Sequence, residues 1–76
     1  MITKLAKSFL SLPDNKKNVI TGNILDAGLI MECSGDYRQF LRLCKSKALG
    51  KAKKIYDILS RLNDSEFDEF LKIIIE

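Results

Sequence analysis

Apolar residues along this chain recur at the spacing of an α-helix and not at that of a β-strand. In the first segment they fall at i, i+3, i+4, i+7 and i+8, on one side of a helix: Ile2, Leu5, Ala6, Phe9 and Leu10. This helix should end near Pro13, because the residue before a proline is pushed out of the helical region. No segment alternates with period two over more than a few residues, so the pattern predicts an all-α protein.

Capping residues mark out a second and a third helix. Asp14 is a natural N-cap for the second, and Gly28 suits the left-handed position that would end it. The expected apolar face of this helix carries Val19, Ile20, Ile24 and Ala27. Ser34 is predicted to cap the third helix, with Asp36 in its first turn, where the helix dipole favours a negative charge. The expected buried face of the third helix carries Tyr37, Phe40, Leu41 and Cys44.

A fourth and a fifth helix complete the predicted bundle. The fourth runs from Gly50 to about Leu62, and Asn63 can cap the fifth with Glu66 in the capping-box position. Inward positions of these two helices are Ala52, Ile55, Leu59, Leu62, Phe67, Phe70, Leu71 and Ile74. The chain is therefore predicted to be a single helical domain, residues 1–76. Its core is expected to contain Phe9, Ile20, Ile24, Phe40, Leu41, Ile55, Leu59, Phe67, Phe70 and Leu71.

Length and composition set the class of protein. A chain of 76 residues forms one domain with a thin core, because a domain of this size buries only about 60% of the surface its unfolded chain exposes. A hydrophobic content of 46% with 30% charged residues argues against disorder. No apolar run approaches the ~18 residues that a membrane span needs, and no signal-peptide pattern opens the chain. The expected location is the cytoplasm or the nucleus, with the cytoplasm preferred.

Charged residues are distributed unevenly along the chain. Between Tyr37 and Tyr56 every charged residue is basic: Arg38, Arg42, Lys45, Lys47, Lys51, Lys53 and Lys54. From Asp57 to Glu76 the sequence has six acidic residues and two basic residues, Arg61 and Lys72. Such an uneven distribution favours electrostatic steering towards a charged partner or towards another copy of the chain.

Residues able to perform catalysis or bind a metal are scarce. The chain has no histidine to act as a base near neutral pH, and its four glycines match no phosphate-binding loop. Cys33 and Cys44 are too few ligands for a structural metal site. Because nothing marks the chain as secreted, we expect two reduced thiols, with a single disulfide as the alternative. We therefore predict no enzymatic activity, no metal and no cofactor.

The basic segment fits a second class of function. Its seven residues resemble the electrostatic footprint of a protein that binds nucleic acid. Three features argue against this class: a net charge of only +3, the acidic C-terminal segment, and tyrosines at positions where partial burial is expected. A small basic helical nucleic-acid-binding protein is therefore the alternative to a protein-binding module.

Four stretches of the sequence carry a family pattern: ILDAGLI (24–30), DYRQFLRL (36–43), GKAKKIYDILSRL (50–62) and SEFDEFLKII (65–74). In this order they resemble the caspase recruitment domain (CARD), a family of the death-fold superfamily. The resemblance covers residues 17 to 75, and GKAKKIYDIL followed by FDEFL is its most specific part. The chain departs from the family in its short first helix and in having five predicted helices where CARDs usually have six.

The resemblance implies a compact death-fold bundle of five to six antiparallel helices that binds other CARD proteins, or copies of itself. In CARDs a basic surface on the first and fourth helices commonly meets an acidic surface on the second and third. The matching basic residues are Lys4, Lys7, Lys51, Lys53 and Lys54, and the matching acidic residues are Asp26, Glu32 and Asp36. The implied function is regulation of apoptosis or innate immune signalling, as an adaptor or as a decoy inhibitor of cellular or viral origin.

Overall fold

The computed structural model describes residues 2–75, which form five α-helices and no strand. The helices are α1 (Ile2–Leu10), α2 (Asp14–Glu32), α3 (Tyr37–Lys47), α4 (Gly50–Leu59) and α5 (Asp64–Ile75). The helices pack into a compact body with principal extents of 31 × 25 × 19 Å. The prediction of an all-α protein is thus confirmed.

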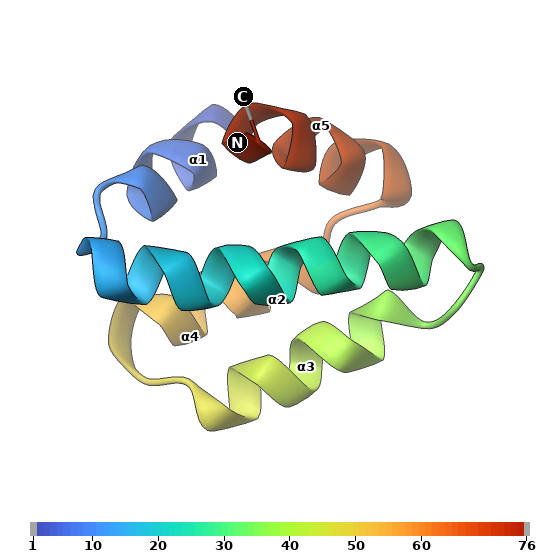
Figure 1. Ribbon diagram of the computed structural model, residues 1–76, viewed down its shortest axis with the longest axis horizontal. Coiled ribbons are helices and arrows are strands. Elements are labelled where there is room, and N and C mark those ends of the chain that lie inside the picture. Colours follow the sequence, from blue (N-terminus) through green and yellow to red (C-terminus); the bar gives the residue numbers. More distant parts are fainter. Residues whose placement is uncertain (1, 76) are drawn as a thin grey trace.

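The longest helix, α2, organises the bundle. It crosses the whole molecule, and α3 returns antiparallel along one side of it after a tight turn (Figure 1). α1 and α5 pack against each other on the other side of α2, and α4 contacts both α3 and α1. This arrangement places α4 between α1 and α3, so residues on two sides of one short helix meet different neighbours.

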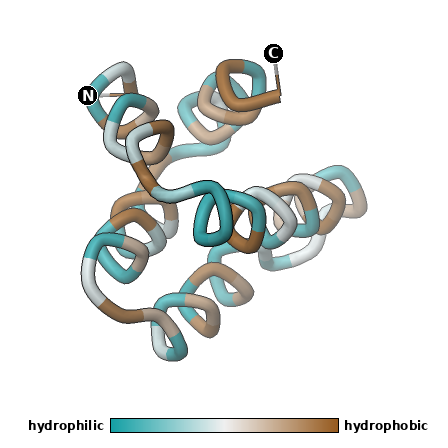
Figure 2. The backbone as a smooth tube through the Cα atoms, turned by 60° about the vertical axis from the view of Figure 1, so that its left-hand side comes forward, coloured by the Kyte–Doolittle hydropathy of each residue, from teal (hydrophilic) through white to brown (hydrophobic). Residues whose placement is uncertain are grey.

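The core is centred on aromatic residues from α1 and α5. Every helix alternates between hydrophobic and hydrophilic stretches along its turns (Figure 2), and the hydrophobic ones supply the core. Phe9 packs edge-on against Phe70 with ring centroids 6.1 Å apart, and Tyr37 stacks on Phe67 at 4.8 Å. All residues of the predicted core are buried except Phe40, which is half-buried at the surface of the core.

The prediction that Gly28 ends the second helix is wrong. The helix continues to Glu32, and a side-chain carbon at Gly28 would lie 3.1 Å from Leu71 Cδ1, so this glycine allows α5 to approach α2. The left-handed residue is instead Ser34, with φ of 60°. Its amide donates to the Met31 carbonyl, and the next amide donates to the carbonyl four residues before Ser34, which is a Schellman ending.

Two other predictions for α2 are also corrected. Val19 was expected on the apolar face of the helix but is 65% exposed, because the buried side of α2 is formed by Ile20, Ile24 and Ala27. Asp14 is the first helical residue rather than the N-cap, and Pro13 takes the cap position. Asp14 instead interacts with Lys17 across one turn, at 3.4 Å.

The ends of the other helices follow their capping side chains. Asp36, not Ser34, caps α3 by accepting a hydrogen bond from the Gln39 amide at 3.1 Å. The capping box predicted for α5 is confirmed: the Glu66 amide donates to Asn63 Oδ1 at 2.8 Å, and the Asn63 amide donates to Glu66 Oε1 at 3.2 Å. α4 ends at Leu59, three residues before the predicted Leu62.

The two thiols differ in their environments. Cys33 is exposed at the end of α2, whereas Cys44 is half-buried on α3 rather than fully buried as predicted. Burial raises the pKa of the Cys44 thiol, which disfavours the reactive thiolate at that position.

Two polar clusters join α3 to α4 and α5. The Tyr37 hydroxyl donates to the Asp64 carboxylate, which also accepts from Arg38 Nη2 at 2.9 Å. Burial and this hydrogen bond raise the pKa of Tyr37 to about 12. In the second cluster, Asp57 accepts from Lys45 and Arg61, each at 2.7 Å. The bond from Lys45 connects α3 to α4 across their interface.

These two carboxylates should make folding depend on pH. The pKa of Asp57 is lowered first by the hydrogen bond from Lys45, and that of Asp64 by the one from Tyr37. A carboxyl group with a lowered pKa stabilises the fold above its unfolded pKa, and this contribution is lost as the pH falls through the folded value. We therefore expect Tm to decrease when the pH is lowered below about 4, which is near the pKa of an aspartate in the unfolded chain.

Scanning calorimetry from pH 7 to pH 2 would check this prediction. An Asp57→Asn, Asp64→Asn double variant should start from a lower Tm at neutral pH and lose less on acidification than the wild type. Asp68→Asn is the matched control, because among residues 2–75 its carboxylate forms a salt bridge only with Lys72, one turn away on the same helix. An acid-induced drop in the double variant equal to that of the wild type would contradict the assignment.

Candidate functional site

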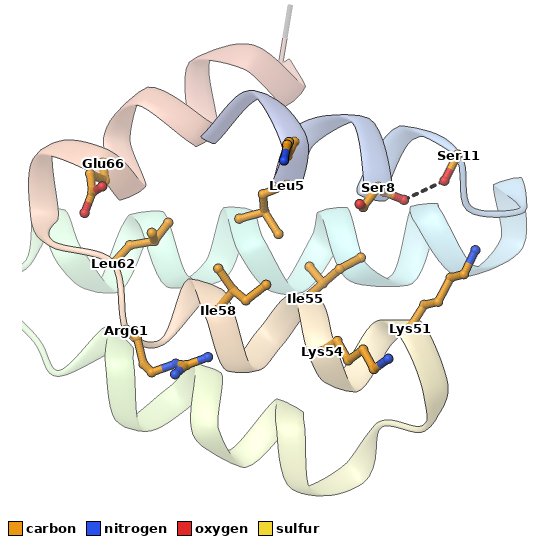
Figure 3. A pocket seen from close by; sticks show the side chains of 11 residues that line it. Leu5, Ser8, Ser11, Lys51, Lys54, Ile55, Ile58, Arg61, Leu62 and Glu66 are labelled. Atoms are coloured by element: carbon orange, nitrogen blue, oxygen red, sulfur yellow. Dashed lines mark hydrogen bonds between the residues drawn. The ribbon is translucent and has the colours of Figure 1, made fainter. Parts of the chain in front are cut away.

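A groove with a volume of about 810 Å³ runs between α1, α4 and the start of α5 (Figure 3). We call it the α1–α4 groove. Its lining residues are Lys4, Leu5, Ser8, Ser11, Lys51, Lys54, Ile55, Ile58, Arg61, Leu62 and Glu66. The groove is therefore built from two parts of the chain that lie far apart in the sequence, residues 4–11 and residues 51–66.

Helical spacing explains why these side chains converge. On α4 and the turn after it, the positions 51, 54, 58 and 61 follow one another at intervals of three or four residues, so they share one side. On α1 and the turn after it, the positions 4, 8 and 11 follow the same spacing. Because α1 packs against α4, the two sides face each other across the groove.

The bottom of the groove is apolar. Leu5, Ile55 and Leu62 are buried beneath it, and Ile58 is half-buried. An open apolar surface bounded by charged side chains is typical of sites that bind another protein.

The positive charge of the groove is not neutralised from within. Lys4, Lys51 and Lys54 are exposed, and no carboxylate of residues 2–75 lies within 4.0 Å of their amino groups. Glu66 lies at the end of the groove opposite Lys51 (Figure 3), where its carboxylate caps α5. The cationic end of the groove is therefore available to a negatively charged partner.

Several basic residues of the sequence have internal roles instead. Arg38 binds Asp64, and both Lys45 and Arg61 bind Asp57. Lys7 and Lys53 are exposed but do not line the groove. Of the five basic residues predicted to bind a partner, the structure thus brings together Lys4, Lys51 and Lys54.

The predicted acidic residues occupy another part of the molecule. Asp26 and Glu32 are exposed on the second half of α2, and Asp36 is exposed where α3 begins. Leu29 is 61% exposed on the same half of α2, and Leu25 beside it is 41% exposed. We call these five residues the acidic surface. None of its three carboxylates takes part in a salt bridge within residues 2–75.

Sequence reasoning missed the apolar part of both surfaces. Ile58 shares a side of α4 with Lys51 and Lys54, and this spacing is readable from the sequence. The contributions of Ser8 and Glu66 depend on how α1 and α5 pack against α4, which no local pattern reveals.

Other kinds of site find little support in this structure. The described part of the chain contains no group of three or more histidine, cysteine or acidic side chains placed to hold a metal ion. Among helices α1 to α5 none combines the length and the apolar character needed to cross a membrane.

The α1–α4 groove and the acidic surface are thus two exposed features, and within residues 2–75 no salt bridge forms at Lys4, Lys51, Lys54 or the three carboxylates. Both are exposed, both combine charge with apolar side chains, and their charges are opposite. A comparison of the chain with protein-family models, with curated proteins and with solved structures gives no match. The functional interpretation therefore depends on the geometry and charge of the chain itself.

Proposed function

We propose that this chain is a CARD-type homotypic interaction module, which binds the acidic surface of another CARD protein in its α1–α4 groove. The observation that carries the proposal is the set of three unpaired lysines, Lys4, Lys51 and Lys54, around an apolar bottom. The resemblance of residues 17 to 75 to CARDs supplies the class of partner. In this proposal the protein acts in the cytoplasm as an adaptor or decoy inhibitor in apoptosis or innate immune signalling.

Both the lysines and the apolar bottom of the groove contribute to binding in this proposal. The lysines attract an acidic partner over a distance of about 10 Å at 0.1 M salt and so raise the association rate. Exposed ion pairs alone contribute only about 0–1 kcal/mol each. Apolar side chains of the partner, equivalent to Leu25 and Leu29 of this acidic surface, would add affinity because they would be buried, away from water, against the apolar bottom of the groove.

The chain carries both complementary surfaces, so it can also associate with itself. The groove of one copy would accept the acidic surface of the next, which is a heterologous, head-to-tail contact. A contact of this kind leaves one groove and one acidic surface free at the two ends of a dimer. A decoy that adds to the end of a partner assembly would occupy such a free surface.

The nucleic-acid alternative loses support at the aromatic residues. Proteins that bind single strands stack bases on exposed aromatic rings, but Tyr37 and Tyr56 are buried here. Phe40 is the most accessible aromatic residue, and even this side chain is half-buried rather than exposed. Two of the seven basic residues in the central segment, Arg38 and Lys45, are already paired with carboxylates.

A binding panel across a salt series separates the two functions. Immobilised protein is exposed to a set of purified CARDs, and to duplex DNA and single-stranded RNA, at salt concentrations from 50 to ~500 mM. We expect selective retention of one or a few CARDs, with moderate weakening as salt rises. Equal retention of every nucleic acid, with a steep loss in salt and no CARD retained, would contradict the proposal.

A further inference from the structure

A second groove, with a volume of about 660 Å³, lies on the opposite side of α4. It is formed by the first half of α2, by α3 from Phe40 onwards, by the α3–α4 connection and by α4, and we call it the Leu49 groove. Its lining residues are Asn15, Lys16, Val19, Ile20, Asn23, Phe40, Leu43, Cys44, Lys47, Ala48, Leu49, Ala52 and Tyr56. None of them lines the α1–α4 groove.

Large apolar side chains are unusually exposed around the Leu49 groove. Leu49 is 85% exposed, Val19 is 65% exposed and Leu43 is 55% exposed. Phe40 is half-buried among the lining residues. Single exposed apolar residues need no explanation, but three gathered around one groove mark a binding surface.

The shape of the groove fits a short helix. Lining positions on α3 recur as 40, 43, 44 and 47, and those on α2 run from 15 to 23, so each wall is about two helical turns, or about 12 Å, long. α2 and α3 are antiparallel and form the two long walls (Figure 1). Helix-in-groove recognition uses a ladder of apolar anchors over such a length.

The charges around the groove define the partner further. Its two charged lining residues, Lys16 and Lys47, are cationic, and no carboxylate in the described part of the chain pairs with them. Asn23 Nδ2 donates to the Tyr56 hydroxyl at 2.9 Å, so these two polar side chains bind each other. Since α2 and α3 are antiparallel, Lys16 near the start of α2 and Lys47 at the end of α3 mark the same end of the groove.

We propose that the Leu49 groove binds an amphipathic helix of a different protein, with apolar anchors at i, i+3 or i+4, and i+7, and acidic residues at the end that meets Lys16 and Lys47. A second copy of this chain fits less well. A second copy would offer the acidic side of α2, where the exposed leucines are Leu25 and Leu29, one helical turn apart. Each wall of the groove extends over about two turns, so two leucines would fill only part of its length. This site is independent of the proposed function, because the two grooves share no lining residue.

Fluorescence polarisation with a labelled synthetic helix tests the proposal. The probe is a 16-residue peptide with three leucines at i, i+3 and i+7 and glutamates in its first turn; a peptide of the same composition with the leucines distributed around the helix is its control. We expect the first peptide to bind and the second not to bind. Leu49→Asp or Leu43→Asp should weaken binding at least about tenfold, because each places a buried charge against the apolar anchors.

Leu29→Asp is the matched control variant, since Leu29 is similarly exposed but lies outside the groove. It should leave peptide binding unchanged, and Leu49→Asp should leave CARD binding in the α1–α4 groove unchanged. Equal binding of the two peptides, or equal weakening by Leu29→Asp and Leu49→Asp, would overturn the proposal. Loss of peptide binding in a Lys51→Glu, Lys54→Glu variant would also overturn it, because the peptide would then occupy the other groove.

Discussion

Replacing Lys51 and Lys54 together by glutamate should weaken association with a CARD partner roughly a hundredfold without unfolding the domain. Both side chains are exposed and form no salt bridge within residues 2–75, so we expect the fold not to depend on their charge. Reversal removes two attractions and adds repulsion from the acidic surface of the partner. Such repulsion costs about 3 kcal/mol, which corresponds to roughly a hundredfold weaker binding. Isothermal calorimetry with the retained CARD measures the loss, and circular dichroism checks the helix content.

A matched control separates the groove from the overall charge. Lys7→Glu with Lys53→Glu makes the same change in net charge at two exposed lysines outside the groove. This variant should weaken binding only slightly, through slower electrostatic steering. Equal losses in the two double variants would mean that binding responds to net charge and not to the groove.

Replacing Phe70 by alanine should bring the domain close to unfolding. The ring is completely buried and packs against Phe9 at the contact between α1 and α5. Truncating a buried phenylalanine costs about 3–5 kcal/mol, and small domains have little more than about 5 kcal/mol in total. Urea denaturation followed by circular dichroism should show a much lower midpoint, or no folded baseline at all.

Leu29→Ala gives the comparison for this variant. Leu29 is 61% exposed, so its truncation should change the free energy of unfolding by no more than about 0.5 kcal/mol. A midpoint for Phe70→Ala close to that of Leu29→Ala would contradict the placement of α5 in the core.

Features set by neighbouring residues were predictable from the sequence. The capping box of Asn63 and Glu66 depends on groups three residues apart, and it forms as expected. The apolar stripe of α5 likewise places Phe67 and Phe70 in the core. In both cases local spacing and the tertiary fold favour the same conformation.

Features set by distant residues were not predictable. Gly28 was expected to end α2 because glycine often follows a helix, but its role depends on Leu71, 43 positions later. Arg38 and Lys45 were counted as part of a basic surface, although Asp64 and Asp57 neutralise them across helix interfaces. The Leu49 groove was missed for the same reason, since its walls come from two separate parts of the sequence, residues 15–23 and residues 40–56.

A polarity swap between two variants of this chain tests the central claim most directly. One variant carries Lys51→Glu and Lys54→Glu in the groove, and the other carries Asp26→Lys and Asp36→Lys on the acidic surface. We predict that the wild type self-associates through its groove and acidic surface. In either variant alone these two surfaces carry like charges, so each variant should sediment as a monomer at the same concentrations. In an equimolar mixture each groove meets an oppositely charged surface of the other variant, and we predict that association returns. A mixture that remains as monomeric as its two components would contradict the account.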